Sequence, residues 1–284
     1  MSSLSRSANR VFEAESSDRV DFSDLSERQS VKLGAMTRYV ARSHFQTWEQ
    51  LRKMPDFDSL SGIFTPLVSL EIEATDAKVR PGEILTARGK SAFGKVLTAS
   101  GAVRQITRDG RHELFGEQGD SLGAVRFVNV FTRYDKDPEK RKILEIPEEL
   151  GVGRLPDRVT DLPTVEDLID RKRAPDFHDS RGGVWQYEQT DPNRHVNSLA
   201  YLSVLQEFAL TELFHAGRSM DRVWVRRAQV VFRKPCFRGE EYQRSVWQIR
   251  TDPQVLGAAI FKVGDPAGHP PAAAASFTLA IHTD

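Results

Sequence analysis

Reactive side chains are most closely spaced in the segment QTDPNRHVN, which runs from Gln189 to Asn197. Within it lie a carboxylate (Asp191), an amide (Asn193) and an imidazole (His195), separated from one another by single residues. A carboxylate can act as a general base or attack a carbonyl carbon directly, and an imidazole can polarise a carbonyl or transfer protons near neutral pH. Because capping a helix requires only one such side chain, the combination favours a functional role for all three.

The pattern of apolar residues places this segment between a strand at 183–189 and a helix from about Ser198 to His215, which Gly217 closes as a C-cap. The unpaired N–H groups and the positive dipole at a helix N-terminus suit an oxyanion that develops on a carbonyl. Asn and Ser at such a turn are also ordinary helix caps, so both interpretations stay open for Asn197 and Ser198.

The rest of the chain supplies the elements that must position this segment. Residues 1–30 lack a sustained periodicity and are expected to form a flexible N-terminal arm. A helix is expected from Val31 to about Met54, where Pro55 ends it. Charged residues and five prolines make 136–180 a linker that contains the domain boundary and one short helix near 164–172. Alternating β-branched and aromatic residues predict strands at 64–74, 83–92, 95–107, 123–134, 223–234, 241–250, 254–263 and 272–282.

The second half of the chain repeats the element order of the first, a helix followed by strands. At an offset of 157 residues, Gly82-Glu83 meets Gly239-Glu240 and the two long helices overlap. A long helix and an antiparallel sheet, each present twice, make an α+β fold that arose by duplication. The helix at 198–215 is apolar around more than half of its circumference, so we expect a strongly curved sheet to wrap it.

The first half lacks the reactive cluster at this offset. Gly34–Arg38 takes the place of Asp191–His195 and contains neither a carboxylate nor an imidazole, so we expect one reaction centre per chain. His44 falls opposite Tyr201 and is interpreted as a packed helix residue.

Two motifs resemble a known enzyme family. The spacing Asp191-x-Asn193-x-His195-Val196-Asn197, with Tyr201 four residues on, resembles the acyl-ACP thioesterases and, more widely, the hotdog-fold thioesterases. Phe232-Arg233-Lys234-Pro235-Cys236 is similar to the aromatic-Arg-Arg-Glu-Cys segment of the same family. The resemblance implies two tandem hotdog domains, each a long central helix wrapped by a curved antiparallel sheet, that form an intrachain pseudo-dimer. It implies a degenerate domain at 31–135 and a catalytic domain at 181–284.

The resemblance also implies a role for each matched residue. Asp191 would act as the nucleophile or as the base for water, Asn193 and His195 would orient and polarise the reacting groups, and Cys236 would line the site. Pro235 stands where the family has a glutamate, so the role of that carboxylate is lost. A free cysteine is more often a small buried apolar residue, and a nucleophilic Cys236 activated by His195 stays an alternative. The residues assigned to substrate binding are Asn197, Ser198, Tyr201, Arg233 and Lys234.

Basic residues gather on and after the strand at 223–234, and they allow two interpretations. A solvated strand edge explains them, and so does docking of an acidic carrier protein or of the CoA phosphates. The residues concerned are Arg226, Arg227, Arg233, Lys234 and Arg238.

Composition excludes several classes of protein. The 40 basic and 40 acidic side chains give a net charge of zero, which does not suit a polybasic nucleic-acid binder. A single cysteine excludes an internal disulfide framework and a cysteine-rich zinc site, and favours a reducing, cytoplasmic setting. No apolar run is long enough for a membrane span, and the N-terminus does not resemble a signal peptide. The absence of a GxSxG motif disfavours an α/β-hydrolase.

We therefore expect an enzyme of fatty acid or polyketide metabolism that hydrolyses an acyl thioester carried on acyl carrier protein or CoA, without a metal or redox cofactor. Three alternatives stay open because fold does not settle function. They are a dehydratase of 3-hydroxyacyl thioesters, a double-hotdog acyltransferase or decarboxylase, and a non-catalytic acyl-thioester-binding protein. Pairing of two chains into a homodimer is a further expectation from the fold family.

Overall fold

Long antiparallel strands and two long helices dominate the computed structural model, which describes residues 10–53, 62–137, 140–146, 156–192, 194–217, 223–251, 254–266 and 268–281. Contacts divide the chain into two units. The first consists of Met1–Val68 and Thr75–Leu162, and the second of Ser69–Ala74 and Pro163–Asp284. The second unit thus includes a segment that the sequence assigned to the first domain, because that segment pairs with a strand of the second half.

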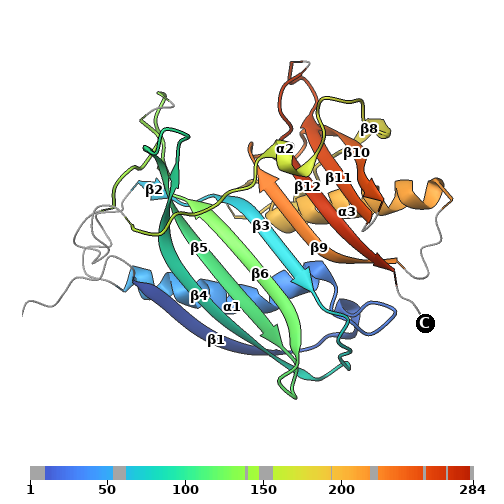
Figure 1. The fold of residues 1–284 in the computed structure, drawn as a ribbon, viewed down its shortest axis with the longest axis horizontal. Helices are drawn as coiled ribbons and strands as arrows, with labels where there is room; N and C mark the ends of the chain where they lie inside the picture. The colour runs from blue at the N-terminus through green and yellow to red at the C-terminus, as the bar shows by residue number, and fades with distance from the viewer. Residues whose placement is uncertain are drawn as a thin grey trace, which may run out of the picture. The chain divides into compact units, whose positions relative to one another are not determined.

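The first unit is a sheet with one long helix, α1 (Leu33–Arg52), against one of its faces (Figure 1). The strands run antiparallel in the order β1-β4-β5-β6. Their bounds are β1 (Val11–Arg19), β4 (Ile84–Leu97), β5 (Val103–Phe115) and β6 (Ser121–Val130), and a small sheet pairs β2 (Ile63–Phe64) with β7 (Thr132–Arg133).

The stripe of α1 that faces the sheet is partly polar. Met36, Val40 and Leu51 are fully buried at helical spacing, and Ser43, His44 and Thr47 are buried between them. Burial of several polar groups in one stripe requires a hydrogen-bonded network beneath the helix.

The second unit has the same plan. Its strands run antiparallel in the order β3-β9-β12-β11-β10-β8, and α3 (Ser198–His215) lies against β10, β11 and β12. The strands are β3 (Leu67–Ala74), β8 (Phe177–Val184), β9 (Val223–Phe232), β10 (Glu241–Thr251), β11 (Gln254–Lys262) and β12 (Ala273–Ile281). The short helix α2 (Val165–Leu168) packs with Val231, Trp247 and fully buried alanines of β11 and β12.

Both long helices are confirmed, and α3 has the predicted bounds. Gly217 has a φ of 78°, in the left-handed region that a glycine adopts after a helix. Met54, the expected end of the first helix, lies outside the described residues.

Four expectations about the elements are wrong. Residues 11–19 are not an arm, because β1 pairs with β4 along its whole length. The hairpin turn between β4 and β5 lies at 98–102, and not before residue 95 as the sequence predicted. The expected strand at 183–189 is shifted: β8 ends at Val184, and a 3-10 helix occupies 187–189. The expected linker at 136–180 contains the first half of β8, whereas the short helix expected within it near 164–172 is confirmed as α2.

The internal repeat is confirmed in its order but needs two offsets. The first residues of β4 and β10 are 157 positions apart in the sequence, whereas the first residues of α1 and α3 are 165 apart. The two offsets differ because the stretch between the long helix and the next long strand has more residues in the first half. At the second offset Ser26–Ser30 is the counterpart of Asp191–His195, and Gly34–Arg38 lies inside α1. His44 correspondingly matches Ala209, and not Tyr201.

Candidate active site

A tight turn between the 3-10 helix (Tyr187–Gln189) and α3 holds the reactive cluster. The Asp191 N–H donates to the carbonyl of His195 at 2.8 Å, and the His195 N–H donates to Oδ1 of Asp191 at 3.2 Å. Arg194 completes the turn with a φ of 65°. The half-buried Asp191 and His195 side chains therefore belong to one closed loop at the start of α3. Asn193 lies outside the described residues.

The loop after β9 contacts this turn and brings the two family-like motifs together. His195 pairs with Phe237 in an antiparallel bridge, and their rings lie 5.1 Å apart at 76°. The Val196 N–H donates to the carbonyl of Cys236 at 2.8 Å. The Phe237 ring restricts where the imidazole can lie. Phe237 could not be selected from its residue type or spacing, since its position beside His195 depends on this long-range pairing.

Asn197 is the N-cap of α3. Its Oδ1 accepts from the Ala200 N–H at 2.8 Å, and its Nδ2 donates to the carbonyl of Gln189 at 3.1 Å. Both ends of the amide are engaged, which favours the capping interpretation for Asn197 over substrate binding. Ser198 is the first residue of the helix and is half-buried.

Tyr201 and Cys236 lie together beneath the turn. The Cys236 N–H donates to the Tyr201 hydroxyl oxygen at 2.8 Å, and the Trp185 ring lies 4.9 Å from the Tyr201 ring. Cys236 is fully buried, and burial raises the pKa of its thiol. Burial also raises the pKa of the Tyr201 hydroxyl. A buried thiol with a raised pKa does not form the thiolate that nucleophilic catalysis needs.

The two basic residues before Cys236 differ in their surroundings. Nζ of Lys234 pairs with Asp265 at 3.0 Å and lies 3.3 Å from Nδ1 of His269, so its charge is anchored to the loop between β11 and β12. The Arg233 side chain is exposed, and so is Arg238, whose guanidinium lies 5.6 Å from the centre of the Tyr187 ring.

Glu240 is the nearest acidic residue in sequence to the position where Pro235 replaces the family's glutamate. Its Oε2 accepts from the Phe237 N–H at 2.9 Å, and its Oε1 pairs with Lys262 at 2.8 Å. In the first unit Glu83 accepts from the Arg80 N–H at 2.6 Å in the matching turn. Glu240 is therefore explained as a turn residue that both halves share, without a catalytic role.

The first unit contains the same turn as the Asp191 loop, built from other side chains. The Ser26 N–H donates to the carbonyl of Ser30 at 2.8 Å, and the Ser30 N–H donates to Oγ of Ser26 at 3.2 Å. Gln29 has a φ of 66°, which matches Arg194. A serine pair therefore suffices for this backbone, and neither a carboxylate nor an imidazole is needed to form it.

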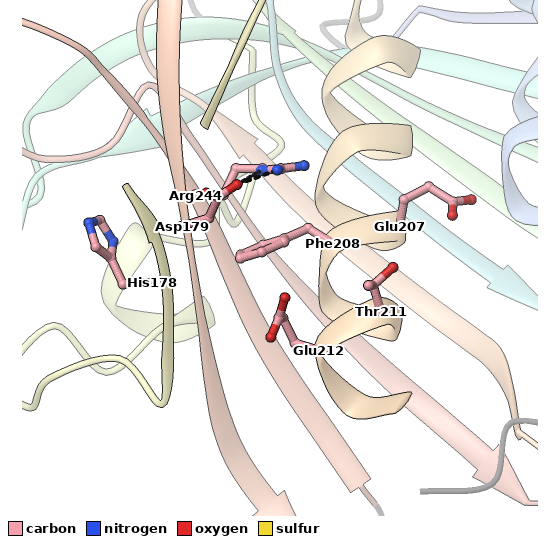
Figure 2. Close-up of a pocket in the computed structure, with 7 residues that line it drawn as sticks. All are labelled: His178, Asp179, Glu207, Phe208, Thr211, Glu212 and Arg244. Atoms are coloured by element: carbon pink, nitrogen blue, oxygen red, sulfur yellow. Dashed lines mark hydrogen bonds and ion pairs between the residues drawn. The ribbon is translucent and has the colours of Figure 1, made fainter. Parts of the chain in front are cut away.

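A hollow of about 340 Å³ lies along the second half of α3, where it faces β8 and β10 (Figure 2). Asp179 pairs with Arg244, whose guanidinium lies 4.6 Å from the centre of the Phe208 ring. The residues that line the hollow are His178, Asp179, Glu207, Phe208, Thr211, Glu212 and Arg244. None of the residues predicted from sequence to form the site lines it, and Glu212 is about 20 Å along the helix from Ser198.

The part of the chain that the structure describes contains no group of three or more His, Cys, Asp or Glu side chains placed to hold a metal ion. It also contains no helix that is both long and apolar enough to cross a membrane.

Comparison with known proteins identifies the architecture. No profile of a protein family and no curated protein sequence matches the chain. Solved structures do match over nearly its whole length. A protein from Lactobacillus plantarum assigned as an oleoyl thioesterase is 14% identical with a TM-score of 0.68, and the match covers 96% of this chain and 97% of that one. The 12:0-ACP thioesterase from Umbellularia californica is 11% identical with a TM-score of 0.68, and the match covers 95% of each chain.

The fold is a double hotdog. The long helices α1 and α3 are the central helices of its two hotdog units. A MaoC-like dehydratase from Phytophthora capsici also matches, at 14% identity and a TM-score of 0.50, over 98% of this chain and 97% of that one. Because different reactions use similar folds, the reaction must be argued from the site.

Proposed function

We propose that this double-hotdog chain hydrolyses acyl thioesters carried on acyl carrier protein or CoA, with its reaction centre at the Asp191 turn. One observation carries the proposal: the same turn forms in the first unit with Ser26 and Ser30 in place of Asp191 and His195. Since the backbone does not require the carboxylate or the imidazole, a role in chemistry accounts for their presence in the second unit.

The proposed mechanism places the thioester carbonyl at the N-terminus of α3. Asp191 removes a proton from water as the water oxygen attacks the carbonyl carbon, or its carboxylate attacks directly and water then cleaves the anhydride. His195 and Asn193 orient the reacting groups. The helix N-terminus favours the oxyanion, and the C–S bond breaks as the thiol leaves with a proton. The products are a free carboxylic acid and the thiol of the carrier.

Cys236 has no part in the proposed chemistry, since its thiol is buried and its pKa is raised. Docking of a carrier or of CoA phosphates is assigned to the exposed cations Arg233 and Arg238. Lys234 supports the loop through Asp265, and Tyr201 holds the Cys236 backbone in place beneath the turn.

The first prediction uses the first unit as a template for inactive variants. Asp191→Ser and His195→Ser introduce the residues that the first unit has at these positions, Ser26 and Ser30, so the backbone hydrogen bonds of the turn should persist. In Asp191→Ser, the serine hydroxyl can still accept from the N–H of residue 195. Each variant should release thiol from acyl-CoA and acyl-ACP at least about 100-fold more slowly than the wild type, while its melting temperature changes little.

A thiol-release assay over a panel of acyl chains measures this, with product identified by mass spectrometry. Free acid as product supports hydrolysis. A 2-enoyl thioester formed from a 3-hydroxyacyl thioester identifies a dehydratase, and an acyl group recovered on an added carrier identifies a transferase. Tight binding of substrate without turnover identifies a binding protein. Unfolding of both serine variants would show that the turn itself requires Asp191 and His195.

A further inference from the structure

A buried polar cluster lies between α1 and strands β4 and β5 of the first unit. We call it the Arg108 cluster, and its members are Ser43, His44, Thr47, Ser91, Arg108 and His112. All six side chains are buried, and nothing in the proposed reaction uses them.

The hydrogen bonds of this cluster fix both histidines in the neutral form. Nε1 of Trp48 donates to Nε2 of His44 at 3.2 Å, so Nδ1 of His44 carries a proton and donates to Nε2 of His112 at 3.2 Å. Nδ1 of His112 then donates to Oγ of Ser43 at 2.9 Å, and that hydroxyl donates to the Val40 carbonyl at 2.9 Å. Every imidazole nitrogen has a partner, and none is left to accept from Arg108.

Arg108 is the group that this network does not satisfy. It is 1% exposed, and its Nη2 donates to Oγ1 of Thr47 at 2.6 Å. Its Nε and Nη1 have no partner, and its guanidinium lies 3.9 Å from the centre of the Trp48 ring. Burial lowers the pKa of Arg108 to about 9, so the side chain remains charged at neutral pH.

The next residue, Asp109, carries a buried charge that is fully paired within the chain. Asp109 is also buried, and it pairs with both Arg126 and Arg158 at 2.8 Å. Arg108 has no carboxylate partner in the described chain, although an unpaired buried charge is strongly destabilising. This contrast indicates that the counter-charge of Arg108 comes from a ligand.

The surroundings of Arg108 define the class of that ligand. Asn129 lies opposite Arg108 on β6, on the same face of the sheet, and its Oδ1 is buried without a partner. Phe93 lies opposite Arg108 on β4, and Phe12 lies 5.7 Å from its guanidinium. The Asn129 oxygen is an acceptor, so it requires a donor such as an ordered water and does not itself select a carboxylate. A water alone would leave the positive charge of Arg108 uncompensated. A carboxylate supplies the charge and accepts from Nε and Nη1, and an aliphatic chain attached to it suits the aromatic side chains.

We propose that Arg108 anchors the carboxylate of an aliphatic ligand inside the first hotdog unit. The assignment does not depend on the reaction at Asp191. Two sources share this chemistry: a free aliphatic carboxylic acid, and the carboxylate at the far end of a dicarboxylic acyl thioester.

Titration with hexanoate and decanoate tests the proposal, with hexanol and decanol as neutral controls. Tryptophan fluorescence reports binding because the Trp48 ring contacts the Arg108 guanidinium. A Trp48→Phe variant shows how much of the fluorescence change comes from Trp48. We expect the acids, and not the alcohols, to bind the wild type and to raise its melting temperature. Arg108→Met should weaken binding at least about tenfold, whereas Arg111→Met, an exposed arginine of the same strand, should leave it unchanged.

Equal affinity of wild type and Arg108→Met, or equal binding of acids and alcohols, would overturn the proposal, as would the absence of binding at millimolar acid. If Arg108→Met does not fold, Arg108→Lys is used in its place, because lysine keeps the positive charge but lacks the planar guanidinium that binds a carboxylate through two N–H groups. Weaker acid binding is expected for Arg108→Lys as well. Adipoyl-CoA and hexanoyl-CoA, titrated into Asp191→Asn, distinguish the two sources. A preference for adipoyl-CoA that Arg108→Met removes assigns the carboxylate to the thioester, and hexanoate binding without that preference assigns a free acid.

Discussion

At the scale of single residues, the two copies of one turn separate chemistry from structure. Asp191 and Ser26 both accept a backbone N–H within their own turn, at 3.2 Å in each case. A hydroxyl accepts this N–H as a carboxylate does, so the bond itself does not require a carboxylate. The carboxylate adds basicity and charge, which a structural turn does not need and a hydrolytic site does.

For Cys236 we expect that a substitution leaves activity nearly unchanged. Cys236→Ala should keep thioesterase activity within the same order of magnitude as the wild type, because its thiol is fully buried and burial raises its pKa. The cost is expected in stability, at about 1 kcal/mol for the lost packing. Iodoacetamide should modify the native protein slowly and the urea-unfolded protein completely. A loss of activity of two orders of magnitude at an unchanged melting temperature would instead restore Cys236 as a nucleophile.

Residue types alone were enough to make Asp191 and His195 candidates, since few structural roles call for both within one short turn, and their catalytic role stays a prediction. They were not enough for Cys236 or Lys234, whose roles depend on burial and on a partner from a distant loop. Arg108 could not be predicted at all. It lies on a strand where five consecutive residues from Ile106 to Gly110 are buried, so alternation gives no sign of which side chains face the helix.

At the scale of elements, the central helices begin with different caps. Asn197 caps α3 through the Ala200 N–H, whereas Lys32 occupies the N-cap of α1 and makes no side-chain cap bond. Asn197→Ala should therefore lower the free energy of unfolding by about 1 kcal/mol, and Lys32→Asn should raise it by up to about 1 kcal/mol. Urea denaturation measures both changes. Lys32→Gln is the matched control, because it removes the same charge without a side chain that caps well; an equal gain from Gln would assign the effect to charge.

The sequence predicted element types better than element boundaries. The bounds of α3 were correct because its apolar periodicity ends at a glycine. The turn between β4 and β5 was misplaced because β4 continues to Leu97, beyond the predicted end at residue 92, and β5 is shifted toward the C-terminus by the same error. β1 was missed because its residues are mostly polar, and it is an edge strand held by backbone bonds to β4. A single repeat offset failed because the two halves differ in the length of one connection.

At the scale of the whole molecule, the buried histidines make stability depend on pH in one unit more than in the other. Burial lowers the pKa of His44 to about 3 and that of His112 to about 4, with nearby Arg108 as a further cause for both. Unfolded histidine titrates near 6.5, so below that pH the unfolded chain binds protons that the folded first unit refuses. The contribution of the two histidines to the free energy of unfolding is therefore fully present above about pH 6.5, and it is lost as the pH drops toward 4.

The expected loss between pH 6.5 and pH 5 is about 3 to 4 kcal/mol for the two histidines together. In the second unit, the Asp176 carboxylate has a pKa below 3.8 because Arg173 hydrogen-bonds to it, so its contribution is lost only at more acidic pH. Hydrogen exchange followed by mass spectrometry at pH 7 and pH 5, corrected for the intrinsic exchange rate, compares peptides from the two units in one sample. Protection should fall in α1, β4 and β5 and persist in α3, β11 and β12. Equal loss in both units would contradict the assignment to His44 and His112, and so would the same difference in a His44→Gln, His112→Gln variant, in which neither group titrates.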